Sequence, residues 1–315
     1  MILGFDIGGT KCAVITAETD GNNIKLLDKQ KIPTQLDITP EEMIEKLIAL
    51  ADGMLNGKKA EKIGISCGGP LNSATGTIEG PPNLPGWNNV KIKDILEKHY
   101  AVPARLQNDA NACAVAEWKF GAGRGTENMV FLTFGTGLGA GLILNGKLYS
   151  GTNDNAGELG HIRLEKFGPV GYGKAGSFEG FCSGGGLAQL GYMKALEKAQ
   201  SGKYPMYFKK GMTAADVTAK TVADAADAGD ETAIEVYRIC GEYLGKGLSL
   251  VIDLLNPEVI VIGSIFARSQ NLLWEPAKKE IAKEALGLSA DCCRVVPAQL
   301  GEKIGDYAAV ASALL

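Results

Sequence analysis

Residues 2–18 read ILGFDIGGTKCAVITAE, two apolar runs joined by a turn that contains adjacent glycines. The apolar, β-branched runs predict a strand on each side of the turn, paired antiparallel. A further strand, IKLLDKQ at 24–30, extends this pattern. Asp6 lies at the end of the first strand, directly before the turn Gly8-Gly9-Thr10. The chain therefore opens with an antiparallel sheet that holds a carboxylate beside a glycine turn.

This first turn has the composition of a phosphate-binding site. Its glycines let the chain fold back with N–H groups pointing outward, and such a cluster of amides binds phosphate oxygens. Thr10 and Lys11 add a hydroxyl and a cation. Asp6 would repel phosphate unless a cation lay between them, so Mg²⁺ is expected on Asp6. A strand follows the turn, which excludes a P-loop. Taken alone, the turn is equally compatible with a plain hairpin.

The second half of the chain repeats this plan. The strand MVFLTF at 129–134 ends in the turn Gly135-Thr136-Gly137, and the strands AGLILN and KLYSG follow. No carboxylate occupies the position that corresponds to Asp6. We therefore expect the first turn to hold metal and the transferred phosphate, and the second turn to hold the remaining phosphates. Two related α/β halves, with both turns facing a cleft, are the expected architecture.

Helices are predicted between the strands. Thr39 is a candidate N-cap, Pro40 suits the first helical position, and Glu42 completes a capping box. A strand KIGISCGGP follows at 62–70. Later segments predict helices at 213–228 and 231–254, and a strand EVIVIG at 258–263 after the break at Asn256-Pro257.

The composition of the 315-residue chain excludes several classes of protein. Apolar residues make up 45% and charged residues 22%, which is typical of soluble globular proteins. The net charge of −4 and the lack of a basic run argue against a nucleic-acid partner. No segment approaches the ~18 apolar residues of a membrane span, and the N-terminus does not resemble a signal peptide. Seven scattered cysteines without a C-x-x-C motif predict free thiols and a cytoplasmic location.

The ordered set of motifs resembles the sugar kinase, actin and Hsp70 superfamily and, within it, the ROK family (repressors, open reading frames and kinases). The resemblance covers essentially the whole chain. It implies two ribonuclease H-like (actin-like ATPase) α/β domains that flank an active-site cleft, formed by residues 1–117 plus 300–315 and by residues 118–299. The motifs that carry it are DIGGTK at 6–11, PPNLPGW at 81–87, NDANACAVAEWKFGAG at 108–123, GTGLGAG at 135–141, GELGH at 157–161 and NPEVIVIGS at 256–264.

The resemblance also implies roles for single residues. Asp109 matches the general base that takes the proton from the sugar hydroxyl, although by its position alone it could simply be an N-cap. A lone histidine such as His161 is more often a structural hydrogen-bonding group than a ligand. The residues expected to contact sugar are Gly69, Asn83, Asn108, Asp109, Glu158, His161 and Glu179. Those expected to bind ATP are Asp6, Gly8, Gly9, Thr10, Lys11, Gly135, Thr136, Gly137 and Gly263, with Mg²⁺ held by Asp6 through water.

The segment FGPVGYGKAGSFEGF at 167–181 departs from the family pattern. Many members carry C-x-C-G-x-x-G-C-x-E here and bind structural zinc through three thiolates and the preceding His. In this chain Val170, Tyr172 and Ser177 replace the cysteines, so no zinc is expected. We expect Val170, Tyr172 and Phe178 to pack the loop as an apolar cluster instead. The match of GYGKAG to G-x-G-x-x-G is accidental, because no strand-to-helix unit with a following acidic residue surrounds it.

The resemblance thus implies an ATP-dependent hexose kinase, most simply one acting on the 6-OH of glucose and working as a homodimer. Kinases for N-acetylmannosamine, N-acetylglucosamine, fructose or allose are alternative readings. A sugar-sensing repressor is a further alternative, disfavoured because no helix-turn-helix precedes the first strand. A sugar-binding relic without activity is disfavoured by Asp6, Lys11 and Asp109. Ser264 stands where the family usually has a second glycine beside the adenosine.

Overall fold

The computed structural model describes residues 1–21 and 23–315. Contacts divide the chain into two compact units, described here one at a time. The first unit comprises Met1–Glu127, Gly141–Ala156 and Gln299–Leu315, and the second comprises Asn128–Ala140 and Gly157–Ala298. The domain boundaries expected from the sequence remain a proposal.

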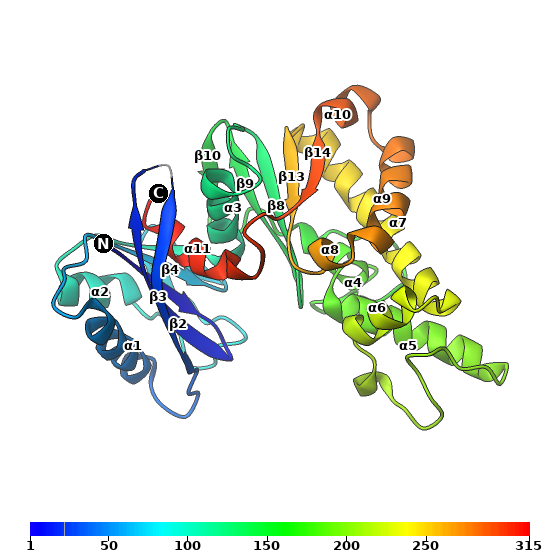
Figure 1. Ribbon diagram of the computed structural model, residues 1–315, viewed down its shortest axis with the longest axis horizontal. Coiled ribbons are helices and arrows are strands. Elements are labelled where there is room, and N and C mark those ends of the chain that lie inside the picture. Colours follow the sequence, from blue (N-terminus) through cyan, green and yellow to red (C-terminus); the bar gives the residue numbers. More distant parts are fainter. Residues whose placement is uncertain (22) are drawn as a thin grey trace. The chain divides into compact units, whose positions relative to one another are not determined.

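The first unit is built on a five-stranded sheet with the strand order β3-β2-β1-β4-β7 (Figure 1). Strands β1, β2 and β3 form the predicted antiparallel arrangement, whereas β1, β4 and β7 run parallel. The carboxyl ends of the three parallel strands therefore reach one edge of the sheet, where ligands bind in open α/β sheets. The strands are β1 (Ile2–Ile7), β2 (Lys11–Thr19), β3 (Ile24–Pro33), β4 (Lys62–Cys67) and β7 (Ala104–Asn108).

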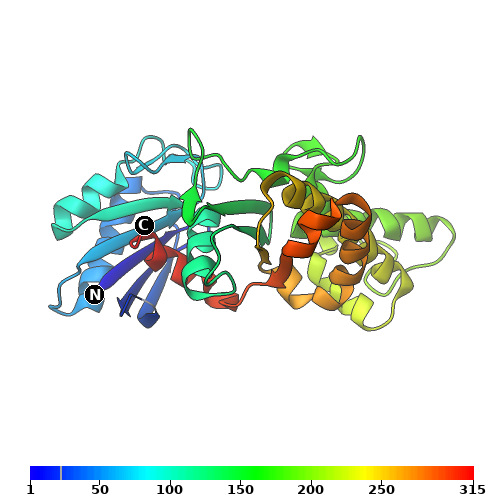
Figure 2. The same cartoon turned by 90° about the horizontal axis from the view of Figure 1, so that it is seen from above.

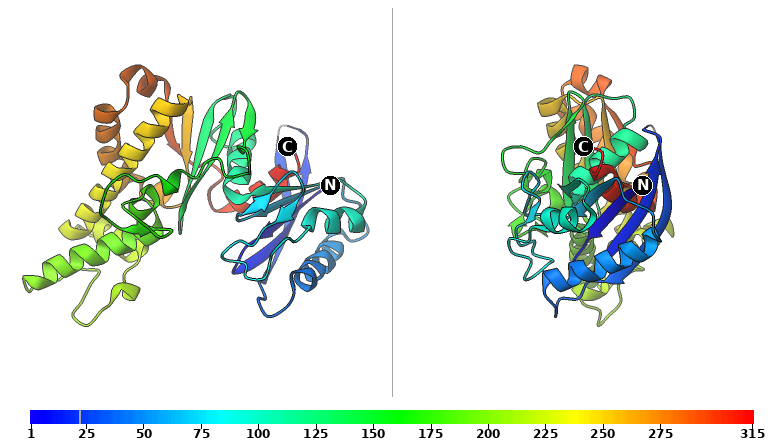
Figure 3. Two further views of the ribbon diagram at one scale, coloured as in Figure 1. Left: turned by 180° about the vertical axis from the view of Figure 1, so that it is seen from behind. Right: turned by 90° about the vertical axis from the view of Figure 1, so that its left-hand side faces the viewer.

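Helices cover both faces of this sheet, because successive side chains of a strand point to opposite faces. Leu3, Phe5 and Ile7 enter the core that α1 and α2 complete, whereas Ile2 enters the core that α11 completes. The sheet and the helices that cover it can also be seen from above and from behind (Figures 2 and 3). The capping box predicted at Thr39 is confirmed at the start of α1. The helices of this unit are α1 (Pro40–Leu55), α2 (Ile92–Tyr100), α3 (Asp109–Phe120) and α11 (Ile304–Ser312).

A second sheet repeats the plan of the first, with the order β10-β9-β8-β13-β14. Again two strands pair antiparallel, β9 with β10, and three run parallel, β8 with β13 and β13 with β14. The α/β class and the repeat predicted from the sequence are confirmed. The strands are β8 (Met129–Phe134), β9 (Leu138–Leu144), β10 (Lys147–Tyr149), β13 (Val259–Ile262) and β14 (Arg294–Pro297).

Helices dominate the rest of the second unit. Its longest helix, α7, packs tightly on α9, because a Cβ on Gly241 would lie 2.5 Å from Pro276 and one on Gly245 2.5 Å from the Ala277 carbonyl oxygen. Glycines at both positions thus allow the two backbones to approach. The helices are α4 (Phe178–Phe181), α5 (Gly184–Gln200), α6 (Ala219–Asp227), α7 (Glu231–Leu255), α8 (Ile265–Arg268), α9 (Gln270–Glu284) and α10 (Gly287–Cys292).

The helix predicted at 231–254 is confirmed as α7, but the helix predicted at 213–228 is wrong in its first part. There the chain forms only a 3₁₀ turn at Ala214–Asp216, and Val217 is extended. Thr218 then caps α6 by accepting a hydrogen bond from the N–H group of Thr221 at 3.1 Å. The remaining short elements are β5 (Leu71–Asn72), β6 (Thr77–Ile78), β11 (Val170–Gly171), β12 (Lys174–Ala175) and 3₁₀ turns at Leu159–His161 and Gly301–Lys303.

All seven cysteines are free thiols, as predicted, and Cys292 is the exposed one. Within the described ranges, 1–21 and 23–315, no helix is both long enough and apolar enough to cross a membrane.

Glu117 ties the end of α3 to the C-terminal segment of the same unit. Its fully buried carboxylate accepts hydrogen bonds from the N–H groups of Ala122 at 2.8 Å, Gln299 at 3.2 Å and Leu300 at 2.8 Å. Glu117→Ala would leave these donors without an acceptor in a partly buried site. We expect the free energy of unfolding to fall by about 2–3 kcal/mol in urea denaturation. Glu117→Gln, which keeps one oxygen acceptor, should lose less, and an unchanged unfolding midpoint for Glu117→Ala would contradict this role.

Candidate functional site

The loops at the carboxyl edge of the first sheet gather most of the polar residues expected in this unit. Asn108 ends β7 and caps α3, because its Oδ1 accepts a hydrogen bond from the Ala110 N–H group at 3.0 Å. Asp109 is the first helical residue rather than the N-cap, and its side chain is exposed. Its Oδ1 accepts from the same N–H group at 2.8 Å. The helix start thus presents a carboxylate at the sheet edge, within reach of a ligand.

The loop after β4 brings two amide side chains to the same place. A Cβ on Gly69 would lie 3.4 Å from Asn108 Nδ2, and one on Gly68 would lie 3.7 Å from Asn83 Oδ1. Both amides therefore lie within van der Waals reach of this loop. Gly69, Asn83, Asn108 and Asp109 therefore form one cluster of donors and acceptors, as sugar recognition requires.

The first glycine turn lies against this cluster. A Cβ on Gly9 would come within 2.2 Å of the Asn83 carbonyl oxygen, so only glycine fits. Thr34, directly after β3, holds the turn: its hydroxyl donates to the Gly8 carbonyl at 2.5 Å and its N–H group donates to the Thr10 carbonyl at 3.0 Å. Lys11, directly after the turn, is exposed. The turn is thus held by hydrogen bonds from Thr34, while Lys11 beside it is exposed to solvent.

Asp6 is the most strongly perturbed carboxylate of the first unit. Burial is the main cause that raises its pKa from 3.8 to about 6, and repulsion from Asp109 adds to the effect. Lys29 opposes the shift but is itself paired with Asp306. Two further carboxylates, Asp109 and Asp306, thus act on Asp6 against two lysines, Lys11 and Lys29, which leaves the site short of positive charge. This deficit fits a divalent cation, and Asp6 is the residue that would hold Mg²⁺.

The second glycine turn is fixed by Glu179, the second residue of α4. Glu179 Oε2 accepts a hydrogen bond from the Leu138 N–H group at 2.9 Å, and a Cβ on Gly137 would lie 2.7 Å from the same oxygen. The Gly135 carbonyl accepts from the N–H group of Gly184 at 2.7 Å, at the start of α5. The turn therefore rests on the two helices that follow it in the chain.

Glu158 directly precedes the 3₁₀ turn beside this site and His161 is its last residue, and both residues are exposed. A Cβ on Gly160 would lie 2.1 Å from the Leu138 carbonyl oxygen and 3.2 Å from Glu179 Cβ. The segment with Glu158 and His161 thus lies against Glu179 and the second turn. The second unit brings its three predicted sugar-contacting residues together with Gly135, Thr136 and Gly137.

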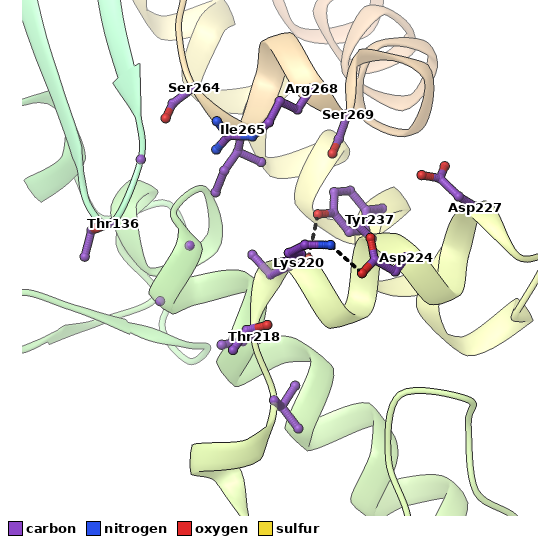
Figure 4. A pocket seen from close by; sticks show the side chains of 17 residues that line it. Thr136, Thr218, Lys220, Asp224, Asp227, Tyr237, Ser264, Ile265, Arg268 and Ser269 are labelled. Atoms are coloured by element: carbon purple, nitrogen blue, oxygen red, sulfur yellow. Dashed lines mark hydrogen bonds and ion pairs between the residues drawn. The ribbon is translucent and has the colours of Figure 1, made fainter. Parts of the chain in front are cut away.

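A pocket of about 660 Å³ opens from the second turn (Figure 4). Gly135 and Thr136 line one part, and Ser264 and Ile265 of the segment after β13 lie nearby. Gly263, predicted to contact ATP, is buried and does not line it. Sequence reasoning missed the pocket's polar residues on α6, α7 and α8, because isolated charges on helices carry no motif. They are Thr218, Lys220, Asp224, Asp227, Tyr237 and Arg268.

Two contacts order the polar part of this pocket. Lys220 forms an ion pair with Asp224 at 2.7 Å, one turn further along α6. The hydroxyl of Tyr237 donates to the Ala219 carbonyl at 3.1 Å and so joins α7 to α6. Together with Arg268 they provide hydrogen-bonding groups of both kinds, next to the apolar Val217, Ala223 and Ile265. Such a lining suits a flat, polar-edged ligand such as a nucleoside.

Ser264 adopts a backbone conformation that normally requires glycine, with φ 57° and ψ −113°. Such conformations cost a residue with a Cβ about 1–3 kcal/mol. Ser264→Gly should therefore raise the free energy of unfolding by about 1 kcal/mol, after the greater entropy of glycine in the unfolded chain is counted. Thermal denaturation measures this gain. Ser289→Gly, in the helix α10, is the control and should lose stability, while a loss for Ser264→Gly would show that no strain exists.

The residues of the 170–179 loop do not fit a zinc ion. His161 is the remaining one of the four family ligands, and no group of three or more His, Cys, Asp or Glu side chains suited to a metal occurs in the part of the chain that the structure describes. The expected apolar cluster of Val170, Tyr172 and Phe178 is wrong. Phe178 is buried, but Val170 is 47% exposed and Tyr172 78% exposed. The Tyr172 ring instead lies edge-on to His161, with centroids 6.3 Å apart.

Comparison with known proteins gives consistent matches over the whole chain. The model of the ROK family matches residues 2–314. The chain is 34% identical over 310 residues to a glucokinase of Halalkalibacterium halodurans, covering 96% of this chain and 92% of the relative. It is 31% identical over 307 residues to a glucokinase of Streptomyces coelicolor, covering 97% and 95%.

Among solved structures, the chain resembles a ROK family glucokinase from Streptomyces griseus in complex with glucose and AMPPNP. The TM-score is 0.77 at 30% identity, with 99% of each chain covered. The predicted actin-like ATPase fold is thereby confirmed.

Proposed function

Because this chain belongs to the ROK family, we propose that it is an ATP-dependent hexose kinase that phosphorylates a sugar hydroxyl, the 6-OH of glucose or of a related hexose. The observation that carries the proposal is the exposed Asp109 carboxylate in one cluster with Asn83, Asn108 and Asp6. A base, sugar-binding amides and a half-buried acid beside a phosphate turn are the parts that phosphoryl transfer to a hydroxyl needs.

Asp109 is assigned as the general base. Its carboxylate accepts the hydroxyl proton as the sugar oxygen forms a bond to the γ-phosphorus. The bond between that phosphorus and the β–γ bridging oxygen breaks, and ADP leaves with the electron pair. Asn83, Asn108, Glu158, His161 and Glu179 are assigned to the sugar hydroxyls. Orientation by these groups supplies most of the remaining rate enhancement, because a bound and oriented sugar has already lost its translational and rotational freedom before the reaction.

The glycine turns are assigned to the phosphates of ATP. Amides of Gly8, Gly9 and Thr10 face the transferred phosphate, and those of the second turn face the others. The nucleoside occupies the pocket with Lys220, Asp224 and Tyr237. Mg²⁺, when bound near Asp6, supplies charge neutralisation for the phosphates.

The proposal also includes the location, the oligomeric state and the partners of the chain. The chain is expected to act as a cytoplasmic homodimer without a nucleic-acid partner. The alternative of a sugar-sensing regulator is not favoured, because the glucokinase relatives match over nearly the full length of both chains. Light scattering on the purified chain tests the dimer.

The test of the activity is an ADP-release assay with ATP and Mg²⁺ across a panel of sugars. Glucose is expected to give the highest kcat/KM, against mannose, fructose, allose, N-acetylglucosamine and N-acetylmannosamine. Preference for an N-acetylated sugar or for fructose would support the proposed kinase activity but change the assigned substrate. No release above the sugar-free background with any sugar would refute the proposed function.

A further inference from the structure

The loop of residues 170–179 leads into the site through Glu179. Strands β11 and β12 form a small hairpin, the chain then passes Ser177, and α4 begins with Phe178 and Glu179. On its other side Glu179 holds the second turn through the Leu138 N–H group, at 2.9 Å. Any shift of the hairpin against α4 therefore moves a carboxylate that contacts the phosphate turn.

Ser177 joins the hairpin to the helix that carries Glu179. Its side chain is fully buried, and its Oγ accepts a hydrogen bond from the Gly180 N–H group at 3.0 Å as the N-cap of α4. The same hydroxyl donates a hydrogen bond to the Gly171 carbonyl at 3.5 Å. A Cβ on Gly171 would lie 2.6 Å from the Gly180 nitrogen and 2.8 Å from Glu179 Cβ. The strand β11 thus lies directly on the first turn of α4, with the serine hydroxyl between them.

Gln189 of α5 holds the other edge of β11. Its Oε1 accepts a hydrogen bond from the Val170 N–H group at 2.9 Å, and its Nε2 donates to the Val170 carbonyl at 2.9 Å. The side chain therefore pairs with the backbone of Val170 as a neighbouring strand would. Because the Val170 side chain is half exposed, its burial contributes little to fixing the strand. The two amide hydrogen bonds fix it instead.

The hairpin is also tied to the segment that carries His161. Lys174 Nζ donates to the His161 carbonyl at 2.7 Å, and the Phe178 N–H group donates to the Ile162 carbonyl at 2.8 Å. The loop thus connects His161, Glu179 and α5 through hydrogen bonds, in addition to the burial of Phe178 and the ring contact between Tyr172 and His161. No ligand set for a metal is needed to explain how its shape is maintained.

We propose that Ser177 and Gln189 are positioning residues that hold Glu179 against the sugar and the second turn without a metal ion. This inference rests on the proposed function for the role of Glu179. The inference goes beyond the proposed function because it names the two side chains that support the site: Ser177 as the N-cap of α4, and Gln189, which holds β11 through two hydrogen bonds and is called the clamp below. Binding of sugar should consequently be independent of zinc.

The experiment compares Ser177→Ala, Gln189→Leu and the double variant with wild type. The double variant should raise KM for glucose about tenfold, the loss expected for a few hydrogen bonds, while KM for ATP changes less. Ser177→Thr keeps a capping hydroxyl and should retain glucose affinity. Gln200→Leu, an exposed glutamine on the same helix, is the matched control and should behave as wild type. Equal changes in both KM values, or an unchanged KM for glucose, would overturn the assignment.

Two readouts do not depend on activity. Hydrogen exchange of the 165–182 segment should accelerate in the double variant and not in Gln200→Leu; unchanged protection would overturn the clamp. Mass-spectrometric metal analysis should find wild type free of stoichiometric zinc, and one zinc per chain would also overturn it. If wild type phosphorylates no sugar, the proposed function fails, while the exchange and metal measurements still decide how the loop is held.

Discussion

Asp109→Asn should lower kcat for hexose phosphorylation by about 10²–10⁴-fold, the usual contribution of a general base. Asparagine has the same shape but cannot accept the hydroxyl proton. Its Oδ1 can still accept the hydrogen bond from Ala110, so α3 should begin at the same residue. KM for glucose should change little, because the loss falls on the transition state.

The control for this substitution is Asp94→Asn. Asp94 is likewise an exposed aspartate in the first turn of a helix of the same unit, α2, and it has no assigned role in the site. It should retain wild-type turnover in the same ADP-release assay. Thermal melting should show that Asp109→Asn folds normally. Wild-type turnover in Asp109→Asn would mean that another group takes the proton.

The sequence predicted those parts of the fold that depend on local pattern. Residues 2–18 consist of two apolar runs joined by a glycine turn, which fits one arrangement of strands, and the repeat at 129–151 predicts a second sheet of the same plan. The capping box at Thr39 and the helix at 231–254 were equally local and are confirmed. The helix at 213–228 failed because Thr218 can cap a new helix as well as continue one, and periodicity does not distinguish the two.

The parts of the site that the sequence could not predict depend on contacts between distant segments. Lys220, Asp224 and Tyr237 line the pocket only because α6 and α7 pack beside the second turn. Glu117 accepts hydrogen bonds from residues about 180 positions later, which no motif announces. Tyr172 stands at a cysteine position of the family pattern, and neither its 78% exposure nor its contact with His161 can be inferred from that position. Glycine-rich turns can be predicted from the sequence, whereas a site formed by side chains from separate helices cannot.

Asp6→Asn is expected to lower kcat/KM by about 10²–10³-fold and at the same time to stabilise the fold. The loss follows because Asp6 would hold the Mg²⁺ that neutralises the phosphates, and removing one preorganised electrostatic contribution of this kind typically lowers the rate by about 10²–10³-fold. The gain follows from the pKa of Asp6, which burial and Asp109 raise to about 6. The folded state therefore binds the proton more tightly than the unfolded state, whose pKa is close to 3.8. The ionised carboxylate costs stability above pH 6, and this cost disappears as the pH falls from 6 toward 3.8.

A shift of this size corresponds to about 2–3 kcal/mol, so Asp6→Asn should be more stable than wild type by up to this amount at pH 7.5 in EDTA. The advantage should shrink at pH 5, where Asp6 is largely protonated in the folded wild type. Millimolar Mg²⁺ should raise the melting temperature of wild type and leave the variant unchanged, because an ion that binds only the folded state stabilises it. Asp28→Asn, an exposed aspartate on β3, is the control and should show neither effect. If Asp6→Asn melted below wild type at pH 7.5 without Mg²⁺, the buried carboxylate would be a structural acceptor rather than a charge held in place for the metal.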